Sequence, residues 1–244
     1  MVVNFNLSGE QFMALNGGPM FKHNPSVSFS VICETNDEIN MLYEKLVTDG
    51  KVMMPLDKYD WSERYAFIQD RFGVAWQLIK GKFSDVNQKI SPCFLFVGKS
   101  FGQAEAAVKF YSTIFPSSAI EGVLLYPKDA EPMGGTVQHA QFTLDGKVFM
   151  AMDGYGEHQF AFNEAMSFVV ECETQEEIDF FWNTLTAGGG AESMCGWLKD
   201  KFGVSWQIIP KKLGTLMSDP DKAPRVMQAL LKMKKPDIAV LEAA

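Results

Sequence analysis

The feature that most constrains the fold of this chain is an internal repeat. Three blocks of sequence occur twice, in the same order, along the 244 residues. The last block of each copy is nearly the same, reading "DRFGVAWQLIKGKF" and then "DKFGVSWQIIPKKL". The matched ranges are 4–18 with 141–155, 28–46 with 167–185, and 70–83 with 200–213. Chance rarely gives three matches in the same order. We therefore infer a duplication and expect the same structural unit twice.

Each block predicts a local structure. The first block indicates two short strands joined by a dipeptide that suits the positive φ of a tight hairpin. The second indicates a half-buried strand and then a helix that begins with a capping box, and the third indicates a closing strand. The residues that carry these predictions are Ser8-Gly9 and Asp145-Gly146 for the turns, and Thr35 with Glu38 and Thr174 with Glu177 for the boxes.

The second copy is preceded by a further strand, helix and strand. The patterns predict a strand over 91–98, a helix over about 103–115 and a strand over 120–127. From Ser91 onward the order is therefore two βαβββ modules in series. The first copy starts at Val2, which aligns with His139, so we expect it to lack its own leading βαβ.

Composition limits the kinds of function. A net charge of −8 argues against a nucleic-acid binder, because phosphate recognition needs clustered lysine and arginine. No apolar run reaches the length of a membrane span and no secretory signal opens the chain, so we expect no membrane partner. The four cysteines lie far apart without a CxxC pair, which favours free thiols in a cytoplasmic protein.

The modules and their closing phrases resemble a known family. Paired βαβββ modules with "FMALNGGP", "DKFGVSWQIIP" and the tail "VMQALLKMKKPDIAVLEAA" are similar to the PhnB-like, or demethylubiquinone methyltransferase-like, branch of the vicinal-oxygen-chelate superfamily. That superfamily includes glyoxalases, bleomycin-resistance proteins and dioxygenases. The resemblance implies an α+β fold in which tandem βαβββ modules form cupped eight-stranded sheets with the ligand inside.

The repeat and the resemblance together predict the domain organisation. We expect an incomplete N-terminal domain over 1–83, a complete domain over 84–213 and a helical tail over 214–244. A first cup without its leading βαβ would leave a sheet edge open, and open edges invite pairing with a second chain. The predicted assembly is therefore a homodimer.

The resemblance also implies positions for a metal. In the superfamily, His or Glu on the first and last strands of each module hold the ion. The matching positions here are Ser91, Asp153, Ala165 and Gln207, with Asn16 and Gln77 in the incomplete copy. Gln77 and Gln207 stand where metal-dependent relatives place Glu, and a neutral amide removes a negative charge from a divalent site. We expect no tight catalytic metal, and Asp153 and His139 are the weak candidates to hold one.

The same positions predict a ligand pocket. Gln207 should face the cup if Trp206 faces the helices, since side chains alternate along a strand. Core packing alone also explains Trp206. The candidate pocket residues are Gln207, Asp153, His139, Met152, Trp206 and Gln77.

Three functions compete at this point. The missing metal ligands favour a module that binds a small organic molecule. The alternative is a metal-dependent enzyme of glyoxalase or dioxygenase type, acting on a substrate with vicinal oxygens. A methyltransferase, as the family label suggests, is less favoured, because only Gly98 and Gly102 follow the strand at 91–98 where a glycine-rich cofactor turn would lie. Whether the chain catalyses a reaction stays open from sequence.

Overall fold

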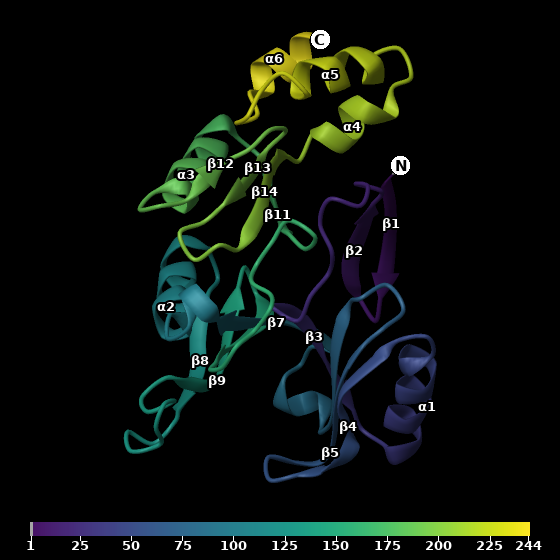
Figure 1. Cartoon of the computed structure of the whole chain (residues 1–244). Helices are drawn as coiled ribbons and strands as arrows, with labels where there is room; N and C mark the ends of the chain where they lie inside the picture. Colours follow the sequence, from purple (N-terminus) through teal and green to yellow (C-terminus); the bar gives the residue numbers. More distant parts are fainter. Residues whose placement is uncertain (1) are drawn as a thin grey trace. The chain divides into compact units, whose positions relative to one another are not determined.

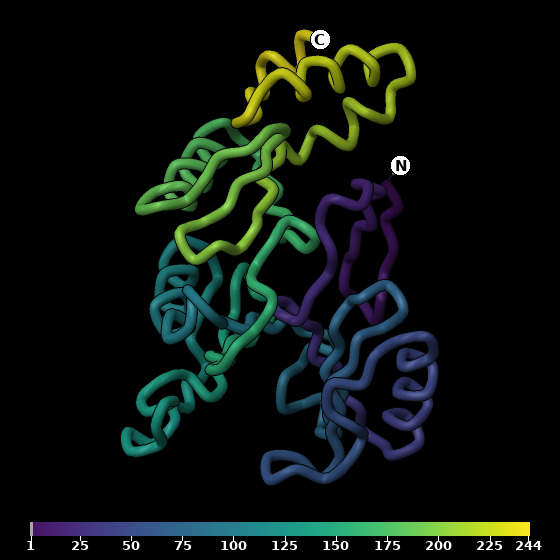
Figure 2. The backbone as a smooth tube through the Cα atoms, viewed as in Figure 1, coloured from purple at the N-terminus to yellow at the C-terminus, as the bar shows by residue number. Residues whose placement is uncertain are grey.

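The computed structural model describes residues 2–244, and these fall into two compact units. Unit 1 spans Met1–Ala161 and unit 2 spans Phe162–Ala244. Figure 1 labels the elements of both units, and Figure 2 follows the same backbone from purple to yellow.

Unit 1 contains ten strands, two α-helices and two 3-10 turns among its described residues. In chain order the elements are β1 (Val2–Leu7), β2 (Glu10–Leu15), β3 (Val27–Cys33), α1 (Asn36–Val47), β4 (Lys51–Tyr59), β5 (Ser62–Gln69), β6 (Ala75–Lys80), η1 (Phe83–Asp85), β7 (Ile90–Val97), η2 (Gly98–Ser100), α2 (Ala104–Ile114), β8 (Ala119–Leu125), β9 (Val137–Leu144) and β10 (Lys147–Gly154).

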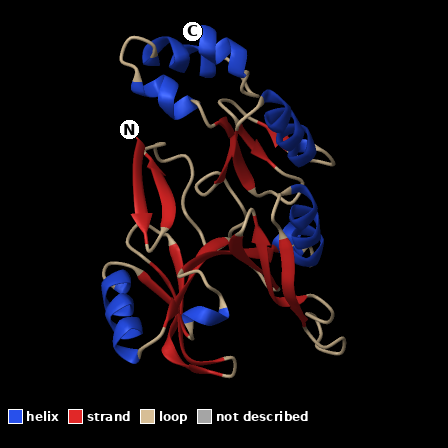
Figure 3. Ribbon diagram, turned by 180° about the vertical axis from the view of Figure 1, so that it is seen from behind, coloured by secondary structure: helices blue, strands red, loops and turns tan. Residues whose placement is uncertain are grey.

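Eight of these strands form one sheet in the order β4-β5-β6-β3-β7-β10-β9-β8. The first strands of two modules, β3 and β7, pair antiparallel at its centre, with Ser30 opposite Ser91 and Ser28 opposite Cys93. The sheet curves, and η1 lies within the curve (Figure 3). The predicted α+β fold with a cupped eight-stranded sheet of tandem βαβββ modules is confirmed.

The pairing of modules differs from the expected one. The sequence predicted that the module at 90–154 would share a sheet with the module at 168–210. In unit 1 its strand β7 pairs instead with β3 of the module at 27–80. The physical reason is the repeat itself, since β3 reads SFSVIC where the later module reads SFVVEC, so both strands suit the same neighbour. The boundaries 1–83, 84–213 and 214–244 stay a prediction.

The first hairpin stands apart as a two-stranded sheet of β1 and β2. Its turn residues Ser8 and Gly9 have φ of 52° and 93°, and Asp145 and Gly146 between β9 and β10 have 48° and 72°. Positive φ at both central positions is the geometry of a type I′ hairpin turn. Both predicted hairpin turns are therefore confirmed.

The helices of the two modules cover one face of the eight-stranded sheet. Arg64 of β5 reaches Asn40 of α1 with its Nε at 3.1 Å, and Phe94 of β7 packs on Tyr111 of α2 at 6.0 Å between ring centroids. Because side chains alternate along a strand, the neighbours of these residues face the other side of the sheet, which is its concave face. By the strand register, the concave face carries Ser28, Ser30, Gln77, Ser91, Cys93, His139, Met150 and Met152.

Unit 2 repeats the module and adds a helical tail. Its elements are β11 (Phe168–Cys172), α3 (Gln175–Thr186), β12 (Ala191–Glu192), β13 (Trp197–Lys199), β14 (Ser205–Pro210), α4 (Leu213–Ser218), α5 (Ala223–Leu230) and α6 (Ile238–Ala243). The strands form a sheet in the order β11-β14-β13-β12. None of the helices among residues 2–244 is long and apolar enough to cross a membrane.

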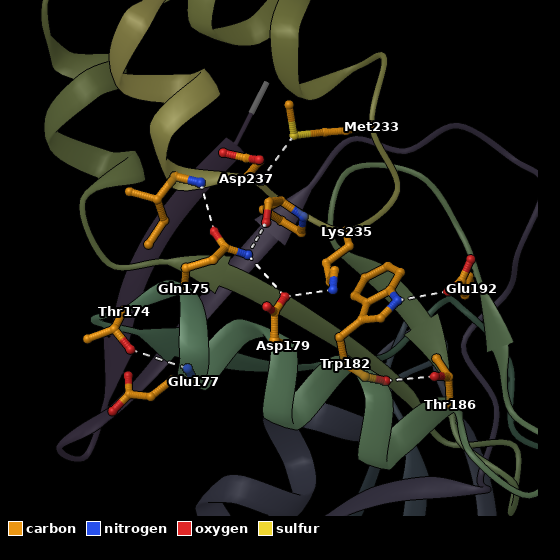
Figure 4. Close-up of polar contacts among 12 residues, drawn as sticks. Thr174, Gln175, Glu177, Asp179, Trp182, Thr186, Glu192, Met233, Lys235 and Asp237 are labelled. Carbon is orange, nitrogen blue, oxygen red and sulfur yellow. Dashed lines mark hydrogen bonds and ion pairs between the residues drawn. The ribbon is translucent and has the colours of Figure 1, made fainter.

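The tail is attached to α3 by polar contacts (Figure 4). Gln175 donates from Nε2 to the carbonyl of Pro236 at 3.2 Å and accepts at Oε1 from the backbone N–H of Ile238 at 3.0 Å. Lys235 pairs with Asp179 at 2.6 Å, and this bond lowers the pKa of the Asp179 carboxyl. On either side of Pro236, α5 and α6 share an apolar cluster of Val226, Leu230 and Leu241.

Both predicted capping boxes form. Thr35 Oγ1 accepts from the N–H of Glu38 at 3.1 Å, and Thr174 Oγ1 accepts from that of Glu177 at 3.3 Å. The glutamate carboxylates reach back to the N–H one residue before each threonine, at 2.8 and 2.7 Å. Each box thus satisfies one backbone donor that the first helical turn leaves free and a second donor directly before the N-cap residue.

The repeated "D-x-F-G-V-x-W" phrase is held by its aspartate. In both modules one carboxylate oxygen accepts two backbone N–H groups of the turn, and the other accepts the indole N–H of the tryptophan, Trp76 at 3.0 Å and Trp206 at 2.9 Å. Asp200 is only 2% exposed. The tryptophan is thereby fixed in the core with its one polar group satisfied.

We expect Asp200→Ala to lower the free energy of unfolding by about 2–3 kcal/mol, because a buried carboxylate and three donors lose their bonds together. Asp200→Asn should cost less, since one acceptor oxygen remains. Urea unfolding followed by tryptophan fluorescence measures both, with the exposed Asp221→Ala as the control. Equal stability of Asp200→Ala and the wild-type protein would contradict this assignment.

Candidate functional site

A chain of buried polar groups crosses the concave face of unit 1. Tyr65 donates its hydroxyl to Gln77 Oε1 at 2.9 Å, and Gln77 Nε2 donates to Ser28 Oγ at 2.8 Å. Both Tyr65 and Gln77 are under a tenth exposed. Burial raises the pKa of the Tyr65 hydroxyl, so it stays protonated and acts as a donor. The predicted residue Gln77 therefore lies on the concave face with both ends of its amide engaged.

The unit 2 module repeats half of this arrangement. Gln207 Nε2 donates to Ser167 Oγ at 2.8 Å, in the same way that Gln77 binds Ser28. Trp206 is fully buried beside Phe168 at 5.6 Å between ring centroids. Alternation along β14 puts Gln207 and Trp206 on opposite faces. Trp206 is therefore a core residue, and Gln207 lies on a different unit from Gln77, His139, Met152 and Asp153.

His139 and Met152 meet on the concave face of the neighbouring strands. His139 lies on β9 and Met152 on β10, and the register between the strands places them side by side. Both side chains are half-buried. Among residues 2–244 no group hydrogen-bonds to the imidazole, and burial lowers its pKa. The ring is thus neutral near pH 7 and offers one donor and one acceptor.

Asp153 lies on the opposite, helix-covered face. Its Oδ1 accepts from the N–H groups of Gly102 at 2.8 Å and Ala104 at 3.3 Å, and its Oδ2 accepts from Val137 at 2.9 Å. Burial raises the pKa of this carboxyl and the backbone donors oppose the rise. Asp153 therefore anchors the start of α2 rather than facing the cup, because it is one residue away from Met152 on the same strand.

The concave face does not fit a tightly held divalent metal. Among the described residues no three His, Cys, Asp or Glu side chains lie close enough together to hold an ion. The face offers serine hydroxyls, an amide whose two ends are already bonded, and one histidine. Zinc sites require about four nitrogen, sulfur or carboxylate ligands. We derive no step through a metal.

The cysteines are poor nucleophiles in this fold. Burial raises the pKa of Cys93, on the concave face, to about 12, that of Cys33 to about 11 and that of Cys172 to about 12. A thiol must lose its proton to attack or to ligate. These three thiols are therefore protonated at neutral pH, and the thiol of Cys93 contacts the polar side chains of Gln77 and Ser28 on the face.

Sequence reasoning missed the linker between the modules. Val86, directly after η1, packs on the concave face against Ile32, Cys93, Val148 and Met150. Gln88 then binds the strand backbone, donating to the carbonyl of Val148 at 2.9 Å and accepting from its N–H at 2.9 Å. The linker thus fills part of the cup. The signal that the sequence offered was a valine and a glutamine, Val86 and Gln88, between two predicted strands.

The eight-stranded sheet of paired βαβββ modules defines the class of protein. A solved structure with this fold is the glyoxalase I mutant V278E from Zea mays, which is 14% identical over 81% of this chain and 72% of that one, with a TM-score of 0.52. That likeness shows the fold alone. This chain therefore shares the fold of that glyoxalase I.

The family follows from a direct match. The model of the 3-demethylubiquinone-9 3-methyltransferase family matches residues 1–79 and 88–209, so the chain belongs to this PhnB-like family. A PhnB protein from Bacillus cereus is 41% identical over 50% of this chain and 99% of that one, with a TM-score of 0.46. A protein from Staphylococcus aureus is 33% identical over 47% and 90%, with a TM-score of 0.20. No curated protein matches the chain.

The position of Asp153 leads to a testable difference between a cap and a ligand. We expect Asp153→Ala to lower the free energy of unfolding by about 2–3 kcal/mol, because three backbone donors lose their acceptor. Metal content after incubation with zinc, manganese or iron(II), followed by desalting, should be the same in both proteins. One equivalent of metal retained by the wild-type protein and lost in the variant would show that Asp153 is a ligand.

The neutral His139 predicts a pH dependence. The unfolded chain takes up a proton on this histidine near its ordinary pKa of 6.5, whereas the folded protein does so only at lower pH. The folded state therefore loses stability as pH falls below about 6.5. We expect the melting temperature of the wild-type protein, relative to that of His139→Gln, to decrease between pH 7.5 and 5.5. A constant difference would contradict a buried neutral imidazole.

Proposed function

We propose that this chain binds a small organic molecule on the concave face of the unit 1 sheet, without a tightly held catalytic metal. The observation that carries the proposal is His139, a neutral, half-buried imidazole without a hydrogen-bond partner among residues 2–244. Neither ring nitrogen of His139 is a fully buried atom without a partner, so both reach solvent and can bond to a ligand without displacing a protein contact. A ligand with a donor or acceptor next to an apolar body would meet both His139 and Met152.

The surroundings of His139 suit a ligand that carries little charge. The face supplies thioether and aliphatic side chains on β7 and β10, including Leu95 and Met152, which are half-buried. Apolar walls with a few convergent polar groups are typical of small-molecule sites. Gln77 and Tyr65 add a polar region whose hydrogen bonds are already made within the protein. They therefore support the concave face rather than bind the ligand.

Catalysis lacks a matching set of groups on this face. Among the described residues no carboxylate shifts the pKa of His139, since the nearby Glu121 accepts a hydrogen bond from Gln141 at 2.6 Å, and the Cys93 thiol is held protonated. The family description names a methyl transfer, so S-adenosylmethionine is the probe that would favour the enzyme over the binding module. We also carry forward as proposals a cytoplasmic location and a homodimer. Within unit 2, strand β11 pairs only with β14, which leaves one edge for a second chain.

A screen tests the proposed function. A thermal-shift screen of small neutral organic molecules should find compounds that raise the melting temperature of the wild-type protein. The same compounds should bind His139→Leu at least about tenfold more weakly, since a lost hydrogen bond in a buried site costs about 1–2 kcal/mol. His158→Ala, a loop histidine bonded to the carbonyl of Tyr155, is the matched control. Hits unaffected by His139→Leu would overturn this site.

A further inference from the structure

Three aromatic rings pack together at the end of the β4–β5 hairpin. Tyr59 and Trp61 stack with ring centroids 5.0 Å apart and an angle of 24° between the rings. Tyr65 meets both rings edge-on, at 5.7 Å from Tyr59 and 5.8 Å from Trp61. Trp61 remains 57% exposed whereas Tyr65 is 7% exposed. The cluster therefore runs from the surface to the buried hydroxyl that donates to Gln77.

The last module does without this cluster. In unit 1 the strands β4 and β5 have nine and eight residues, whereas their counterparts β12 and β13 have two and three. The extra length lies near the segment MPLDKYDWSERYAF, because residues 47–69 of the first copy number 23 whereas the matching residues 186–199 number 14. Because the shorter module still holds its Gln–Ser and Asp–Trp contacts, the insertion is not needed for these contacts.

The cluster lies at the rim of the concave face. Tyr65 belongs to the same face of β5 as Phe67, which is opposite Gln77 in the register between β5 and β6. Tyr59 is held in place by a bond from its hydroxyl to the carbonyl of Pro55 at 3.0 Å. With Tyr59 against it, Trp61 has a fixed orientation and a large exposed area, which is the geometry of a stacking surface.

The charges near Trp61 determine which charge a ligand ring stacked on it should carry. The segment Asp57–Glu63 carries three carboxylates and one lysine. Glu63 pairs with Lys80 at 3.4 Å, but Asp60, next to Trp61, has no ion-pair partner among the described residues. A cation over the face of a tryptophan is also attracted by the ring itself. Both effects favour a positive charge and disfavour a negative one.

We propose that the exposed face of Trp61 is a stacking site for a planar aromatic cation at the rim of the concave face. The ring of such a ligand would lie on Trp61 with its charge toward Asp60, and the rest of the molecule would extend past Tyr65 toward the concave face. This inference rests on the proposed function and adds one charged end to its ligand. The cationic ring lies at the rim on Trp61, and the uncharged remainder of the ligand occupies the concave face at His139.

Three probes of similar size test the proposal on the full chain by isothermal titration calorimetry. They are 1-methylquinolinium as the planar cation, quinoline-3-carboxylate as the planar anion, and choline as a cation without a ring. We expect 1-methylquinolinium to bind most tightly. Trp61→Ala should weaken that binding by about tenfold or more, and Trp61→Phe by only about threefold, since phenylalanine keeps a smaller stacking face. Asp60→Asn should weaken the binding of the cation, and the anion should bind as tightly as before or more tightly.

The control is Phe72→Ala, which removes a more exposed ring far from any aromatic partner of Trp61 and should leave binding unchanged. Circular dichroism and melting temperature show whether each variant folds. If Trp61→Ala does not fold, Trp61→Phe and Asp60→Asn still test the stacking site. Equal binding of the cation by wild-type protein and by both Trp61 variants would overturn the stacking site.

The two proposals fail in different ways. If the neutral hits of the thermal-shift screen depend on His139 while 1-methylquinolinium does not bind, the proposed function stands and the stacking site is wrong. If 1-methylquinolinium binds through Trp61 but no compound depends on His139, the ring site stands alone and the concave face is not its continuation.

Discussion

The antiparallel pairing of β3 with β7 is the interaction on which the rest of unit 1 depends. Each module by itself is a four-stranded sheet with its first strand at an edge, as unit 2 shows. Pairing two first strands removes both edges and makes one curved surface from two modules. It also sets the register that brings Ser28 and Ser30 beside Cys93 and Ser91. A slip by one residue would turn every one of these side chains to the other face.

The buried polar chain of Tyr65, Gln77 and Ser28 combines a contact that supports the sheet with one that belongs to the long hairpin. The contact of Gln with a serine occurs in the modules at 27–80 and 168–210, with Ser28 in β3 and with Ser167 directly before β11, which indicates that it supports the sheet in these two modules. The bond from Tyr65 occurs only where the long hairpin is present. A satisfied polar network rigidifies the wall around it. We infer that the Gln–Ser contact supports the sheet and that the hairpin adapts one module for a ligand.

The candidate site was partly predictable. Strand alternation alone separates Met152 from Asp153, and Gln207 from Trp206, so no two neighbours could both face the cup. The prediction that included all four was too broad for that reason. His139 and Gln77 lie on the concave face, and their contact with a ligand stays a prediction. Asp153 could not be recognised as an anchor for α2, because its three donors come from segments 16 to 51 residues away in sequence.

The sequence by itself determined the local structure. Its repeats, turn dipeptides and capping boxes specify hairpins, helices and closing strands through contacts within a few residues, and such contacts can be predicted from pattern. Only the tertiary structure decided which modules share a sheet. The strands β3 and β11 carry nearly the same residues, so either could satisfy the edge of β7, and local pattern does not distinguish them. The packing of Val86 against residues of β3, β7 and β10 follows from that long-range choice, whereas the three rings at Trp61 meet within a single hairpin.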